Sequence, residues 1–181
     1  LTLSFEILAD TTAHPDAGVR AELVALLAAA SGATGLVGGQ MLDLMSDKLG
    51  DPAAPELDHI RRLQAMKTGA LIRYACEAGA VIGGASPDER GALRSFGEHL
   101  GIVFQIADDL LDATGDAATV GKATGKDATA GKATQVARLG VADATTYLGE
   151  TAQAAIADLA PFAARGAVLH DAVRFAAERV K

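Results

Sequence analysis

The sequence of 181 residues contains no tryptophan, and aromatic residues make up only 4% of it. Its single cysteine, Cys76, excludes an internal disulfide, so nothing in the sequence indicates an oxidising compartment. Basic residues are also few: the sequence has 16 Lys and Arg and 23 Asp and Glu, which gives a net charge of −7. Nucleic-acid binding needs clustered positive charge. We therefore expect a cytoplasmic protein without a nucleic-acid partner.

Long hydrophobic runs are interrupted. The stretch Leu23–Leu42 carries no charge, but serine, threonine and glycine residues fall inside it. We interpret it as two helices joined by a turn at Ser31–Gly35 and not as a membrane anchor. The chain begins at Leu1, and acidic residues within its first ten positions do not suit a secretory signal.

Alanine is abundant, with 40 residues, and it is the strongest helix former. Apolar spacing and helix-entry signals such as Ser86–Glu89 predict an all-α chain in one domain spanning residues 1–181. The expected helices are Leu1–Ala9, Pro15–Ala30, Thr34–Leu49, Leu57–Ile82, Asp88–Ala113, Val141–Leu159 and Arg165–Arg179.

Several glycines fall inside these helices, at a cost of up to about 1 kcal/mol each relative to alanine. Gly97 and Gly101 share one helix face. Two explanations are open: close approach of a neighbouring helix, or room for a ligand against the backbone.

Three carboxylates interrupt an otherwise apolar helix in the segment FQIADDLLD. Asp108, Asp109 and Asp112 lie within about a turn of one another, so we expect them to project toward a shared side. A divalent cation between them offsets their repulsion, and oxygen-only ligands suit Mg²⁺. Taken alone, the segment DDLLD is equally consistent with a solvated acidic helix face.

Lysines near this cluster favour a polyphosphate ligand. The segment Thr114–Thr134, by composition a flexible Gly/Ala/Thr linker, carries Lys122, Lys126 and Lys132. Lys67 and Thr68 add a cation and a hydroxyl on another expected helix. Metal, lysine charges and backbone N–H groups freed by glycine are the groups that bind a polyphosphate.

Four motifs in order along nearly the whole chain resemble the trans-isoprenyl diphosphate synthases, the family of farnesyl, geranylgeranyl and longer polyprenyl diphosphate synthases. GLVGGQMLDLMSD at 35–47 is similar to the family's GxxGGQxLDL helix, and MKTGALI at 66–72 to its HxxKTGAL helix. FQIADDLLDATGD at 104–116 resembles its second aspartate-rich motif, and VGKATGKDATAGKAT at 120–134 the lysine-rich loop that follows it.

The resemblance implies an antiparallel helical bundle of the isoprenoid synthase type. It implies an Mg²⁺-dependent, homodimeric prenyltransferase that condenses isopentenyl diphosphate with an allylic diphosphate. The implied metal ligands are Asp108, Asp109 and Asp112, and the residues implied to contact the diphosphate or the allylic group are Lys67, Thr68, Gln105, Lys122 and Lys132. Further substrate-binding positions are Gln40, Asp43 and Lys126.

Two departures from the family pattern stand out. The lysine-rich loop has Ala123 and Gln135 where the family usually carries Thr and Tyr, and the family's first aspartate-rich motif and its arginines are absent. We therefore expect the C-terminal part of a larger synthase domain that lacks its N-terminal helices and is inactive alone. A non-catalytic partner subunit and a terpene cyclase of the same fold remain the alternatives.

Overall fold

The computed structural model describes residues 1–48, 56–114 and 134–179, and in these ranges it contains helices and no strands. The prediction of an all-α chain is therefore confirmed. The elements are α1 (Thr2–Ala9), α2 (Ala17–Ser31), α3 (Leu36–Lys48), α4 (Leu57–Gln64), η1 (Ala65–Gly69), α5 (Ala70–Ile82), α6 (Pro87–Thr114), α9 (Gln135–Leu139), α10 (Val141–Asp158), η2 (Ala160–Gly166) and α11 (Ala167–Glu178).

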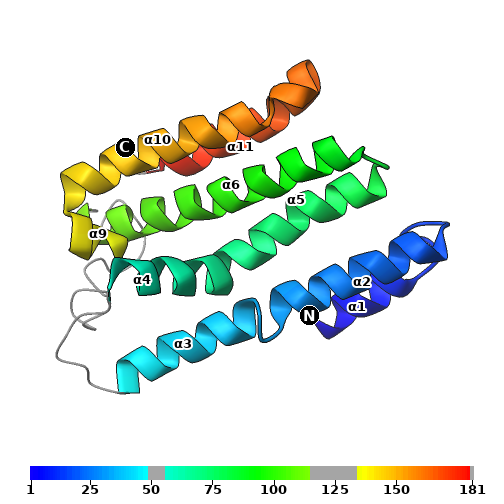
Figure 1. Cartoon of the computed structure of the whole chain (residues 1–181), viewed down its shortest axis with the longest axis horizontal. Coiled ribbons are helices and arrows are strands. Elements are labelled where there is room, and N and C mark those ends of the chain that lie inside the picture. Colours follow the sequence, from blue (N-terminus) through cyan, green and yellow to red (C-terminus); the bar gives the residue numbers. More distant parts are fainter. Residues whose placement is uncertain (49–55, 115–133, 180–181) are drawn as a thin grey trace.

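Helix α6 is the centre of the bundle. Figure 1 shows it between α5 on one side and α10 on the other, with α11 beside α10 and with α2 and α3 beyond α4 and α5. Its Phe96, Val103 and Ile106 are fully buried and pack with Leu148 of α10 and Val173 of α11. The packing of this apolar core sets the rotation of α6 about its axis and therefore determines which of its faces carry polar side chains.

Glycines bring α5 and α6 together. A Cβ atom on Gly97 would lie 2.7 Å from the Cα of Arg73, and one on Gly101 would lie 2.9 Å from the Cα of Gly69. Both distances are too short for real atoms, so only glycine allows this separation of the two backbones. Of the two explanations for these glycines, the structure confirms close helix approach.

The apolar stretch near the N-terminus is divided as predicted. Residues Ala17–Met45 are long and apolar enough to span a membrane by length and composition, and 28% of the most apolar part is buried in the bundle. The structure ends α2 at Ser31 and begins α3 at Leu36, with Gly35 N donating to Gly32 O at 3.1 Å. The prediction of two helices is confirmed, while the absence of a membrane anchor stays a prediction.

The helix expected at Leu57–Ile82 is continuous but changes its winding. Residues Ala65–Gly69 form the π-helical turn η1 between α4 and α5. A π turn inserts one extra residue, and such turns are frequent at functional sites. Here the turn contains Lys67 and Thr68, two of the predicted site residues.

Candidate functional site

The π turn directs Lys67 toward α3. Its Nζ lies 2.5 Å from Asp43 Oδ2, and the two side chains are 35% and 20% exposed. This contact depends on Gly39, because a Cβ there would lie 2.7 Å from the Cα of Lys67. Gln40, one turn before Asp43, is partly buried on the same helix. The structure therefore brings a predicted diphosphate-binding lysine to a predicted substrate-binding carboxylate.

Thr68, the next residue of the turn, connects to the acidic helix α6. Its hydroxyl donates to Gln105 Oε1 at 3.1 Å, and Gln105 Nε2 donates to Asp109 Oδ1 at 2.9 Å. Three of the predicted site residues thus form one hydrogen-bonded group at the interface of η1 and α6. The separation of these helices is set one turn earlier, where Gly101 meets Gly69.

The three carboxylates of α6 do not share one side, contrary to the expectation from their spacing. Consecutive residues on a helix point about 100° apart, so Asp108 and Asp109 diverge. The Asp108 side chain is 56% exposed, Asp109 is only 4% exposed, and Asp112 is partly buried. In the part of the chain that the structure describes, no group of three or more His, Cys, Asp or Glu side chains is placed to hold a metal ion. Magnesium binding at these residues therefore stays a prediction.

Arg179, which the sequence analysis did not single out, lies beside the exposed carboxylate. Its guanidinium is 4.0 Å from Asp108 Oδ1 and 4.4 Å from the centroid of the Phe104 ring, and it donates to Phe104 O at 3.3 Å. Its position in the sequence is weak evidence for a site residue, because a basic residue at the end of a predicted helix is ordinarily solvated. Packing of α11 against α6 brings this arginine to the acidic helix.

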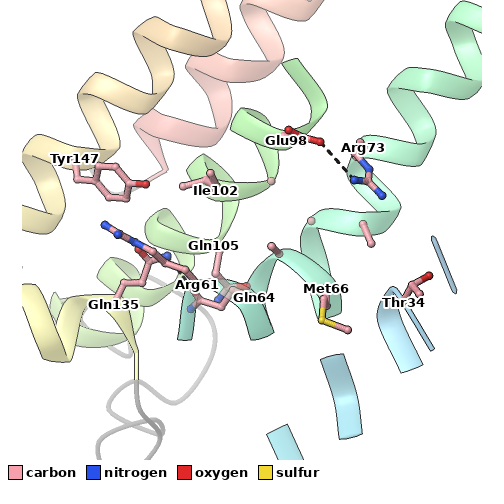
Figure 2. A pocket seen from close by; sticks show the side chains of 14 residues that line it. Thr34, Arg61, Gln64, Met66, Arg73, Glu98, Ile102, Gln105, Gln135 and Tyr147 are labelled. Carbon is pink, nitrogen blue, oxygen red and sulfur yellow. Dashed lines mark hydrogen bonds and ion pairs between the residues drawn. The ribbon is translucent and has the colours of Figure 1, made fainter. Parts of the chain in front are cut away.

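Two hollows flank the α5–α6 pair. One, of about 330 Å³, lies between α4, α5, α6 and α10, and Figure 2 shows Gln64, Gln105 and Gln135 grouped near Arg61, with Tyr147 on α10 beyond them. The Arg61 guanidinium stacks 5.2 Å from the Tyr147 ring centroid. The other hollow, of about 470 Å³, is almost entirely apolar and is lined by Thr68, Ile72, Leu100, Phe104, Ala172, Phe175, Ala176 and Arg179.

Three predicted site lysines, Lys122, Lys126 and Lys132, lie outside the described residues, as does most of the segment interpreted as a linker. Just after that segment, the short helix α9 was not predicted. Thr134 caps it by accepting a hydrogen bond from Ala137 N at 3.1 Å. Its first residue, Gln135, is buried against Gln64 of α4, and neither glutamine was among the predicted site residues.

Comparisons with known proteins agree with this architecture. Residues 1–160 match the profile of the polyprenyl synthetase family. The chain is 40% identical over 150 residues to farnesyl diphosphate synthase of Escherichia coli, covering 79% of this chain and 47% of that protein. It is 38% identical over 125 residues to geranylgeranyl pyrophosphate synthase 3 of Arabidopsis thaliana, covering 67% of this chain and 34% of that protein.

Solved structures give the same result. The crystal structure of an FPP/GFPP synthase from Zymomonas mobilis superposes with a TM-score of 0.85 at 38% identity, covering 97% of this chain and 57% of that one. A Helicobacter pylori geranyltransferase crystallised with magnesium and isoprenyl diphosphate superposes with a TM-score of 0.77 at 28% identity, covering 97% and 55%. The chain spans between a third and about half of the curated relatives named above. By both profile and fold, it belongs to the polyprenyl synthetase family.

Proposed function

We propose that the protein is an Mg²⁺-dependent prenyltransferase that condenses isopentenyl diphosphate with an allylic diphosphate. The observation that carries this proposal is the junction of η1 and α6. There Thr68 donates to Gln105, which donates to Asp109 of α6, and the neighbouring Lys67 pairs with Asp43 of α3. A cation, a hydroxyl and carboxylates at one end of a helical bundle are groups that bind a metal–diphosphate complex.

The donor set on α6 suits a hard cation, because it consists of carboxylate oxygens with no sulfur or imidazole among them. Asp108 offers the most exposed carboxylate, and Asp109 and Asp112 complete the proposed set. When bound, Mg²⁺ would supply stabilisation of the negative charge that develops as diphosphate leaves.

The chain's own residues bind and orient the substrate. The Lys67 ammonium, held by Asp43, supplies a fixed positive charge for the diphosphate, and the Thr68 hydroxyl, held by Gln105, supplies a directed polar group. Next to them, Phe104 and Leu100 line the apolar hollow between α5, α6 and α11. Apolar walls of this kind exclude water from a reactive allylic group.

A substrate assay separates this proposal from the two alternatives. The full-length protein is incubated with Mg²⁺ and geranyl diphosphate, with and without isopentenyl diphosphate, and released diphosphate and chain-extended product are measured. Release that requires isopentenyl diphosphate supports the prenyltransferase. Release of diphosphate and a hydrocarbon without it indicates a cyclase, and no release indicates a non-catalytic subunit.

Two variants tie the activity to the proposed residues. Asp108→Ala should lower turnover by roughly a hundredfold or more, because it removes a proposed metal ligand. Asp171→Ala, an exposed aspartate on α11, is the matched control and should leave turnover unchanged. Equal effects of the two substitutions would contradict the assignment of Asp108.

We also propose a cytoplasmic homodimer. Large apolar side chains, including Leu3 and Ile7 of α1 and Val37 and Met41 of α3, are more than half exposed in the single chain. Apolar groups at this exposure favour burial between subunits. Light scattering at working concentration should give the mass of a dimer, and a monomer mass would refute this part of the proposal.

A further inference from the structure

A chain of side-chain hydrogen bonds connects the Thr68–Gln105–Asp109 group to helices α4 and α9. Gln64 Nε2 of α4 donates to Asp109 Oδ2 at 3.0 Å, and Gln135 Nε2 of α9 donates to Gln64 Oε1 at 2.6 Å. The five residues stand at positions 64, 68, 105, 109 and 135, so three segments distant in sequence are connected through one carboxylate. Figure 2 shows Gln64, Gln105 and Gln135 close together in the lining of this cavity.

The direction of every bond in this chain of hydrogen bonds follows from Asp109. An ionised carboxylate only accepts hydrogen bonds, so Gln64 and Gln105 must both turn their NH₂ groups toward it. Their carbonyl oxygens then face outward, where they accept from Gln135 and Thr68 respectively. Gln135 can satisfy Gln64 only through its own NH₂ group. Gln135 and Thr68 therefore stabilise the rotation of the two amides that the carboxylate requires.

Stability alone does not explain a glutamine at position 135. The residue is 2% exposed, and its Oε1 has no hydrogen-bond partner among the described residues. An unpaired buried acceptor is unfavourable, whereas an apolar side chain of similar size would avoid that cost. The donor function of Gln135 toward Gln64 is what the apolar side chain would lose.

We propose that Gln64 and Gln135 are positioning residues of the diphosphate site, which act through Asp109. Gln64 holds Oδ2 of Asp109 toward the bundle interior, and Gln135 holds Gln64 in the orientation that donates. When Gln64 is lost, or when loss of Gln135 lets Gln64 turn its carbonyl oxygen inward, Asp109 Oδ2 loses the amide donor that orients it. Its metal-binding geometry relative to Asp108 changes, and the affinity for a metal–diphosphate complex falls. This inference rests on the proposed function only in that Asp109 belongs to the metal–diphosphate site.

The test compares three variants of the full-length protein, Gln64→Leu, Gln135→Leu and the double variant, with Gln153→Leu as the control. Gln153 lies on α10 and is exposed. Mn²⁺ is titrated in the presence of inorganic diphosphate and followed by electron paramagnetic resonance. Loss of a residue that orients a metal ligand typically weakens metal affinity by about 10–100-fold. We expect a loss in this range for Gln64→Leu and about tenfold for Gln135→Leu, with none for Gln153→Leu.

Two features of the result distinguish positioning from general destabilisation. The double variant should bind no more weakly than Gln64→Leu, because Gln135 acts only through Gln64. Gln135→Leu should change Tm little, because it removes the unpaired buried oxygen of Gln135 but leaves Gln64 Oε1 without its donor. Unchanged Mn²⁺ affinity in Gln135→Leu, or additive losses in the double variant, would overturn the inference.

A second measurement covers the case in which the leucine variants fold poorly. Gln135→Met keeps the length of the side chain and removes the donor without adding a charge, and it should weaken Mn²⁺ binding to the same extent as Gln135→Leu. In protein labelled with side-chain ¹⁵N-glutamine, the Gln64 amide resonances should shift in this variant and stay in place in Gln153→Leu. Unmoved Gln64 resonances would refute this chain of hydrogen bonds.

These readouts do not depend on turnover, so the two proposals fail separately. If the wild type transferred no prenyl group but Gln135→Leu still weakened Mn²⁺ binding, only the proposed function would be rejected. If the wild type transferred a prenyl group but Gln135→Leu bound Mn²⁺ as tightly as the wild type, only the positioning role would be rejected.

Discussion

The contact between α3 and η1 predicts opposite effects for two glycine-to-alanine substitutions. Gly39 is buried, and a Cβ there would lie 2.7 Å from the Cα and 2.9 Å from the Cβ of Lys67. Gly79 is exposed on α5, and a Cβ there would meet nothing within 4 Å. Both residues lie inside helices, so the gain in helix propensity is the same and only the space differs.

The magnitudes follow from these two surroundings. Gly79→Ala should stabilise the fold by about 0.5–1 kcal/mol, the preference of a helix interior for alanine over glycine. Gly39→Ala gains the same amount but must separate two backbones, and overpacking of this kind costs about 1–3 kcal/mol. Because neither backbone can rotate away as a flexible side chain would, we expect the upper part of that range and a net loss of roughly 1–2 kcal/mol.

Thermal unfolding followed by circular dichroism measures both effects. For a chain of this size, 1 kcal/mol corresponds to about 2–4 °C in Tm. Gly79→Ala should therefore raise Tm by about 1–4 °C and Gly39→Ala lower it by about 2–8 °C. Gly39→Ala should also weaken diphosphate binding, because the substitution displaces Lys67. A rise of Tm in Gly39→Ala equal to that in Gly79→Ala would refute the close approach of α3 to η1.

Three further predictions concern the Cys76 thiol, the Glu89 carboxyl and the binding of Mg²⁺. Burial raises the pKa of the Cys76 thiol to about 11, so the folded protein should react very slowly with a disulfide reagent at pH 8, and rapid reaction comparable to the denatured chain would contradict its burial. Hydrogen bonds from the Ser86 backbone and then from the Arg165 side chain lower the pKa of Glu89. The ionised Glu89 therefore stabilises the fold above its ordinary pKa of 4.5, and this stabilisation is lost as the pH falls through the lowered pKa. Acid unfolding of Glu89→Gln should lack this loss of stability, and identical acid-unfolding profiles of the variant and the wild type would contradict the prediction. Calorimetry should detect little binding of Mg²⁺ alone and clear binding when inorganic diphosphate is present, because Mg²⁺ keeps its waters until phosphate oxygens replace them, and tight binding without phosphate would count against the proposed arrangement.

Helix positions could be predicted because their signals are local. At the start of α6, Ser86 N donates to Glu89 Oε2 at 3.0 Å and Glu89 N donates to Ser86 Oγ at 3.3 Å, a reciprocal cap that is visible in the sequence. The predicted ends of the seven helices lie within about two residues of the observed ones, apart from the internal change of winding at η1. Apolar spacing and caps need only neighbouring residues, so no tertiary contact was required.

The features that were missed depend on contacts between distant segments. The π turn coincides with the place where Gly39 of α3 approaches Lys67, and α9 is a five-residue helix whose buried Gln135 bonds to Gln64. Neither follows from periodicity, because a π turn keeps nearly the same apolar pattern and a five-residue helix has too few positions to show one. The sequence carries an indirect sign of each feature: the glycines of α3 near the π turn, and Gln135 at a position where the family usually has tyrosine.

The same distinction explains the carboxylates of α6. Spacing along the sequence shows that Asp108 and Asp109 are on one helix, but tertiary packing decides which of them faces the interior. Phe96, Val103 and Ile106 fix the rotation of α6, and that rotation turns Asp109 inward and leaves Asp108 exposed. A buried carboxylate is tolerated only when hydrogen-bond donors satisfy it, and the neutral amides of Gln64 and Gln105 are two such donors to Asp109. A lysine in place of either amide would compete with a metal ion for the carboxylate, whereas a neutral amide orients the carboxylate without adding a positive charge beside it.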